Sequence, residues 1–265
     1  MMRSLKIYFY IFYYNFLGIL AYPYELLITV VQPALEVGFM ALFWSMIAKN
    51  SHSYINLTSM ITYFILVQFV AIWAINPDGL NFVNYIGYRI KYGGLNQTLI
   101  RPLRPLPTLL FEHRGFYFID MIFSVLLLFI AIILIGNVTV AQLIWFAIFL
   151  FLSFVTVFAF STLISSIAFS TKEIGGIKNS ISHLVRVLSG TLVPLTLFPE
   201  NIKSVLIYTP FPSMVFAPIN VLQNKLSLED ILFNLQISLF WAIILFAISV
   251  LVWRHNIKKY ESIGI

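Results

Sequence analysis

The sequence has no cysteine and few charged residues. Of its 265 residues, 10% are Asp, Glu, Lys or Arg and 60% are hydrophobic, and the mean hydropathy is +0.94. A soluble domain is typically ~25% charged, so this composition excludes a water-facing globule and predicts an integral membrane protein. The absence of cysteine excludes disulfides and thiolate sites. None of the four histidines lies three or four residues from another, so no local metal-binding pair is expected.

Motifs for nucleotide binding and for common hydrolytic chemistry are missing as well. The sequence contains no G-x-x-x-x-G-K-[ST], no H-E-x-x-H and no G-x-S-x-G, so we expect no catalytic residue, no metal site and no cofactor bound by this chain. The net charge is +6. On a membrane protein such an excess is typical of cytoplasmic loops that face anionic lipid, so we expect membrane lipid and not nucleic acid as a partner.

Long stretches without charge predict six transmembrane helices, because ~20 mostly apolar residues cross the ~30 Å hydrocarbon core. Gly136 and Asn137 are the expected turn between the third and fourth spans. The tyrosine-rich residues 1–22 predict a helix in the membrane interface; a signal peptide is the alternative, but no small-x-small cleavage site follows. We expect one all-α transmembrane domain over residues 1–265, with spans at about 26–48, 55–75, 119–136, 140–168, 177–198 and 231–253.

The basic residues predict the orientation of these spans. With six crossings, twelve Lys and Arg fall on the side of both termini and three on the other side, so both termini are expected to be cytoplasmic. The first set is Arg3, Lys6, Arg89, Lys91, Arg101, Arg104, Arg114, Lys172, Lys178, Arg254, Lys258 and Lys259, and the second is Lys49, Lys203 and Lys225.

The inner loop 76–118 has the pattern of a short helix on a stiff support. Gly93-Gly94 breaks the preceding element, 95–100 is long enough for about one and a half helical turns, and Arg101 before Pro102 ends it. Pro105 and Pro107 are expected to form an extended return. A basic loop lying on lipid headgroups explains the charges but not the glycines and prolines, so we favour a lever that docks on a partner.

The outer loop between the last two spans is unusually apolar. Residues 204–224 carry no acidic or basic side chain, and Pro210, Pro212 and Pro218 argue against one straight helix. We expect re-entrant helices that the protein covers. A seventh span is the alternative, which the distribution of basic residues disfavours.

Two charges fall inside predicted spans. Glu36 and Arg186 lie at similar depth in the first and fifth spans, and charges at that depth usually find partners. We therefore expect an ion pair, within one chain or between chains, that lines or borders a translocation pathway. In the alternative, the fifth span begins later and Arg186 reaches the inner headgroups. His183 lies on the same helix face as Arg186 and is expected to be a polar lining residue rather than a proton relay.

Two clusters of residues resemble signatures of the ABC-2 type permeases, in particular a bacterial family of transport-system permease components. The first cluster is Gly94-Leu95, Leu99, Arg101-Pro102 and Pro105. The second is Ser189-Gly190, Pro194-Leu195, Phe198-Pro199, Pro210-Phe211-Pro212 and Pro218. The resemblance extends over essentially the whole chain.

The resemblance implies a transport subunit of the plasma membrane that is not itself an enzyme. ATP and Mg²⁺ would be bound by a separate ATPase subunit, and a second permease chain, identical or a sister permease, would complete the transporter. The segment 95–100 would be the coupling helix, and the function of the subunit would be export. The aromatic, nearly uncharged spans themselves fit a hydrophobic or amphipathic substrate. Residues expected to couple to the ATPase are Arg89, Lys91, Gly94, Leu95, Leu99, Arg101 and Arg104.

Two other readings stay open at this point. One is an ATPase-independent secondary transporter or channel subunit, although Glu36 is the only acidic residue deep in a predicted span. The other is a structural or assembly subunit, or a membrane-embedded enzyme. An enzyme would need a group of polar residues at the same depth in the membrane, and the sequence shows none.

Overall fold

The computed structural model describes residues 2–50, 57–74, 80–171 and 174–260. Within these ranges the chain is helical and has no strand, so the prediction of an all-α protein is confirmed. By length and composition, four helices in the described ranges could cross a membrane. They are α2 (Pro23–Asn50), α7 (Phe118–Ile135), α8 (Val140–Ser165), whose apolar stretch continues through α9 (Ala168–Thr171), and α14 (Leu228–Ile257).

Three further helices lie where the sequence predicts membrane segments. Helix α1 (Met2–Leu20) covers most of the predicted interfacial helix. Helix α3 (Leu57–Trp73) corresponds to the second predicted span and is ~26 Å long at 1.5 Å per residue. Helix α10 (Gly175–Leu188) is only ~21 Å long and ends at Leu188, whereas the predicted span continues to 198.

The end of α10 has a local physical reason. Gly190 has a φ of 89°, a conformation that costs side-chain-bearing residues energy and turns the chain out of the helix. A Cβ at this position would also lie 2.7 Å from the Tyr63 hydroxyl oxygen. That hydroxyl donates a hydrogen bond of 2.8 Å to the Gly190 carbonyl oxygen. The turn is therefore fixed by close contact with α3.

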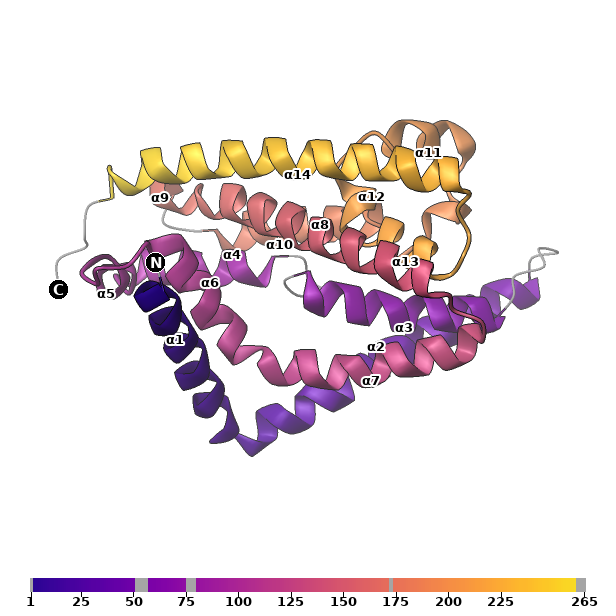
Figure 1. Ribbon diagram of the computed structural model, residues 1–265, viewed down its shortest axis with the longest axis horizontal. Helices are drawn as coiled ribbons and strands as arrows, with labels where there is room; N and C mark the ends of the chain where they lie inside the picture. The colour runs from indigo at the N-terminus through magenta and orange to yellow at the C-terminus, as the bar shows by residue number, and fades with distance from the viewer. Residues whose placement is uncertain (1, 51–56, 75–79, 172–173, 261–265) are drawn as a thin grey trace.

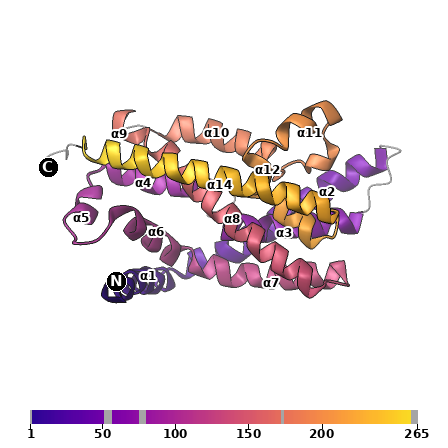
Figure 2. The ribbon, with the colours of Figure 1, turned by 45° about the horizontal axis from the view of Figure 1, so that its top comes forward.

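Helices α2, α3, α7, α8 and α14 run roughly lengthwise, and α1 is inclined to them (Figures 1 and 2). The start of α1, the end of α14, α9 and α5 lie at one end of the molecule, and α11 and α13 lie toward the other (Figure 1). The remaining helices are α4 (Asn81–Lys91), α5 (Leu95–Leu99), α6 (Pro105–Phe116), η1 (Leu195–Leu197), α11 (Glu200–Leu206), α12 (Phe211–Met214) and α13 (Phe216–Leu222).

The proline-rich segment before α14 is folded back into the protein. Every residue of α13 is buried, and α12 and α13 pack against α8. Polar side chains bind the backbone groups that the broken helices leave free: the Ser153 hydroxyl donates to the Met214 carbonyl, and Trp241 Nε1 donates to the Tyr208 carbonyl at 2.8 Å. Because its backbone is satisfied in this way, the broken segment can be apolar without being a water-facing loop.

Candidate functional site

A short helix is held at one end of the molecule by α4 and α6. Helix α4 stops at Lys91, and Gly93, with a φ of 72°, turns the chain into α5. A positive φ costs other L-residues ~1–2 kcal/mol, so Gly93 is the constrained glycine of the pair. Gly94 has a φ of −62°, and a Cβ there would meet only Arg89 atoms at ordinary distances of 3.5 Å or more. The predicted short helix is present, but the turn into it depends on Gly93, whereas Gly94 was the glycine that we included among the coupling residues.

The predicted extended return after α5 is wrong. Pro105 and Pro107 both lie in the first turn of α6, with Pro105 as the first helical residue. Proline is tolerated there because the first N–H groups of a helix have no intrahelical acceptor and the fixed φ of proline suits the helix. Only residues 100–104 connect α5 to α6, so the two helices α4 and α6 support the lever formed by residues 93–104.

Glu112 on α6 links all three elements. Its side chain is 5% exposed and accepts from Arg89 Nη2 at 3.0 Å and from Arg101 Nη1 at 3.0 Å. The Tyr85 hydroxyl donates to the same carboxylate at 2.9 Å. Arg89 Nη1 donates in turn to Thr98 Oγ1 on α5 at 3.2 Å. We call Tyr85, Arg89, Thr98, Arg101 and Glu112 the Glu112 cluster.

The Glu112 cluster changes the interpretation of two predicted coupling residues. Arg89 and Arg101 are held by Glu112 within the chain, although the side chain of Arg101 stays 43% exposed. The remaining predicted cations, Lys91 and Arg104, are not part of the cluster: Lys91 lies over the Tyr92 ring, and Arg104 is exposed with its backbone N–H bonded to Tyr8 on α1.

Helix α5 presents an apolar edge outward. Leu95 and Thr98 are buried, so they anchor the helix and do not lie on its outer surface. Leu99 is 36% exposed, and Ile100, directly after the helix, is 83% exposed. Exposed apolar side chains on a rigid support are typical of a surface that binds a partner.

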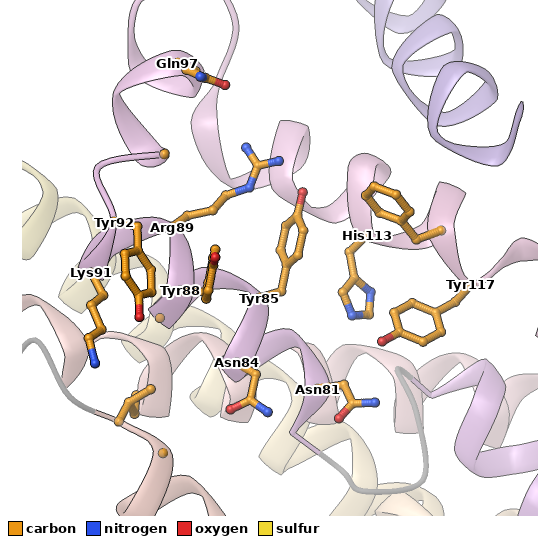
Figure 3. Close-up of a pocket in the computed structure, with 15 residues that line it drawn as sticks. Asn81, Asn84, Tyr85, Tyr88, Arg89, Lys91, Tyr92, Gln97, His113 and Tyr117 are labelled. Atoms are coloured by element: carbon orange, nitrogen blue, oxygen red, sulfur yellow. The ribbon is translucent and has the colours of Figure 1, made fainter. Parts of the chain in front are cut away.

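A polar cavity of about 850 Å³ lies beside the lever, between α4, α5, α6 and the start of α10. Figure 3 shows Tyr85 of α4 beside His113 of α6, and the centres of their rings are 5.5 Å apart. His113 is 2% exposed and neither ring nitrogen has a hydrogen-bond partner within the described residues. Burial, and to a lesser degree the charge of Arg114, lowers the pKa of His113 to about 3, so this ring is neutral at physiological pH.

The structure brings Glu36 and Arg186 together. Arg186 Nη2 on α10 lies 2.9 Å from Glu36 Oε1 on α2, and the two side chains are 18% and 27% exposed. Gln68 Nε2 on α3 donates to Glu36 Oε2 at 2.8 Å. One carboxylate thus joins three helices. An open groove of about 360 Å³ along α2 includes Glu36 in its lining. His183 is exposed and is not part of this contact.

Two residues at these sites were not predicted. Glu112 was the one acid between Arg101 and Arg114, and its position among cations was a usable signal for a charge partner. Gln68 was an amide in an otherwise apolar run; polar side chains in such runs usually bind one another. Both signals point to a partner without saying which of several helices supplies it.

The comparisons with known proteins agree with this architecture. The model of the family described as ABC-2 family transporter protein matches residues 34–264. A search of curated proteins finds no match. The matched range includes the ion pair, the Glu112 cluster and all helices from α3 to α14, so this chain belongs to the ABC-2 transporter family and is a transmembrane permease.

Proposed function

We propose that the chain is the permease subunit of an ATP-driven exporter and that the α5 lever, residues 93–104, docks on a separate ATPase subunit. One observation carries the proposal: an apolar edge with Ile100 83% exposed is presented by a helix that the buried Glu112 carboxylate holds to α4 and α6. Rigid attachment lets a displacement of α5 move α4 and α6 together. The ATPase would bind ATP and Mg²⁺, which this chain has no motif to bind.

We further propose six crossings of the plasma membrane with both termini in the cytoplasm. The start of α1, α5, α9 and the end of α14 lie at the same molecular end, as the distribution of basic residues predicts (Figure 1). Helix α10 is too short to cross alone, so the fifth crossing would be completed by residues 189–198, which include the η1 turn. In this topology α12 and α13 are re-entrant.

A second permease chain, identical or a sister permease, would complete the translocation pathway. No residue in the apolar window of α2 is fully buried by the rest of the chain, and Glu36 lies on this helix. An ion pair on this helix would border a pathway between two chains, with His183 nearby on α10. The few charges in the spans favour a hydrophobic or amphipathic substrate, and the family resemblance favours export.

The test is a charge placed on the apolar edge. Ile100→Asp should abolish assembly with the ATPase and ATP-dependent accumulation of substrate in inverted vesicles, because an aspartate would have to be desolvated in the interface. Ile202→Asp is the matched control, since Ile202 is also exposed but lies on α11. Retained assembly and transport in the Ile100→Asp protein would reject α5 as the docking element. Transport that requires an ion gradient and no ATPase would favour a secondary transporter.

A further inference from the structure

An apolar cavity of about 540 Å³ lies between α1, α6, α7 and α8, separate from the polar cavity beside the lever. Cavities of ~300–1,000 Å³ are the size that holds a lipid-like or drug-sized ligand. Its walls are aromatic and aliphatic, with Arg114 as the one charged side chain in the lining. The walls include Phe12, Trp73, Phe118, Ala147, Phe151 and Phe154.

Arg114 has no acidic partner within the described residues. Its Nη1 donates to the Ile72 carbonyl at 3.0 Å and its Nη2 to the Trp73 carbonyl at 2.6 Å, so it binds the carbonyl end of α3. A weak contact of Nη1 with Met121 Sδ at 3.9 Å is its other hydrogen bond. These contacts use three of the five guanidinium N–H groups. Two donors and a full positive charge therefore remain for a ligand.

The charge of Arg114 persists despite its environment. Burial lowers the pKa of Arg114 to about 10, which leaves it protonated at neutral pH. Its guanidinium carbon lies 5.0 Å from the centre of the Phe154 ring, which also lines the cavity. A half-buried cation without a carboxylate is still costly in a mostly apolar cavity, and an anion there would relieve that cost.

We propose that this cavity binds an anionic phospholipid of the surrounding bilayer, with its phosphate beside Arg114 and an acyl chain against Phe118, Phe151 and Phe154. Charge and shape agree: the apolar walls suit a hydrocarbon chain, and Arg114, which has no acidic partner in the part of the chain that the structure describes, suits a phosphodiester. Arg114 lies four residues before the first residue of α7, which is headgroup depth in the topology proposed above. The depth depends on that topology, but the binding does not.

The experiment is native mass spectrometry of the full-length chain with dioleoyl phosphatidylglycerol, dioleoyl phosphatidylcholine or oleate. We expect one phosphatidylglycerol to be retained about tenfold more strongly than phosphatidylcholine with the same acyl chains, which corresponds to ~1.4 kcal/mol. Arg114→Gln should bring this ratio close to one. Because Arg114 also caps α3, a second variant that retains it is needed.

Ala147→Trp provides that variant, because Ala147 lines the cavity and a tryptophan there would fill it. It should lose the tightly retained lipid, while Ala141→Trp, on an exposed site of the same helix outside the lining, should retain it. Equal retention in the two tryptophan variants, or an unchanged lipid ratio in Arg114→Gln, would overturn the proposal. Displacement of phosphatidylglycerol by equimolar oleate would also overturn it, since the occupant would then be a free fatty acid.

Discussion

Replacing Glu112 by glutamine should loosen α5 without disturbing the rest of the fold. Glutamine has nearly the same shape, so the change removes charge and not volume. Arg89 and Arg101 would lose their acidic partner, and the Tyr85 hydroxyl would lose a charged acceptor. The predicted consequence is local opening of the α5 lever from α4 and α6.

The structure allows the magnitude to be worked out. Breaking a fully buried ion pair costs ~3–5 kcal/mol, but Arg89 is 22% exposed and part of this cost is relieved by water. The pair with Arg101, whose side chain is 43% exposed, contributes ~0–1 kcal/mol. We therefore expect Glu112→Gln to lower the free energy of opening the α5 lever by ~2–4 kcal/mol. At ~1.4 kcal/mol per tenfold, this makes opening of α5 about 30- to 700-fold more frequent.

Hydrogen–deuterium exchange measures this opening directly. The amides of Asn96 and Ile100, which bond to Gly93 and Asn96 carbonyls within and beside α5, should exchange faster by that factor in Glu112→Gln. Glu200→Gln is the matched control, because Glu200 is 80% exposed and its one ion pair among the described residues is with Lys203 on α11. Exchange of the α5 amides within threefold of the unchanged chain would refute the role of the Glu112 cluster.

Three other predictions follow from the geometry. Gly93→Ala should destabilise the lever by ~1–2 kcal/mol because of its positive φ, whereas Gly94→Ala should be neutral; equal thermal melting of the two variants would contradict this. Glu36→Arg and Arg186→Glu should each lower stability, and the double reversal should recover part of the loss with a coupling of ~0.5–3 kcal/mol; no recovery would show that the pair contributes nothing. The pKa of His113 is about 3 in the folded chain and 6.5 in the unfolded chain. The neutral ring therefore contributes fully to the free energy of unfolding above pH 6.5, and this contribution falls toward pH 3 by up to ~1.4 kcal/mol per pH unit. His113→Phe should flatten the melting temperature between pH 7 and 5, and an unchanged slope would argue against a neutral buried ring.

Helix positions were the part of the fold that the sequence predicted well. The Gly136 turn between α7 and α8 was expected from a residue that accepts positive φ, and Gly136 has a φ of 84°. In these regions the local pattern and the final structure agree. At α10 they do not, because the helix end is fixed by contact of Gly190 with Tyr63, which is 127 residues away in sequence.

The candidate site was predicted in outline only. A short helix after Gly93-Gly94 follows from local chain chemistry, and the structure has it. Which charges face outward does not follow, because Arg89 and Arg101 are bound by a glutamate on another helix. The prolines were misread for a related reason: Pro105 can end one element or begin the next, and only the packing of α6 on α1 and α4 decides. Charge partners depend on tertiary structure, which single-sequence patterns do not contain.

The most direct test of the account is single-cysteine labelling of the α5 lever, since the natural chain has no cysteine to remove. Ile100→Cys should react with a membrane-impermeant maleimide in inverted vesicles but not in intact cells, and the bound ATPase should protect it. Ile202→Cys on α11 should show the opposite sidedness. Labelling of Ile100→Cys from outside the cell would contradict the cytoplasmic position of the α5 lever, and labelling that the ATPase leaves unchanged would contradict its docking role.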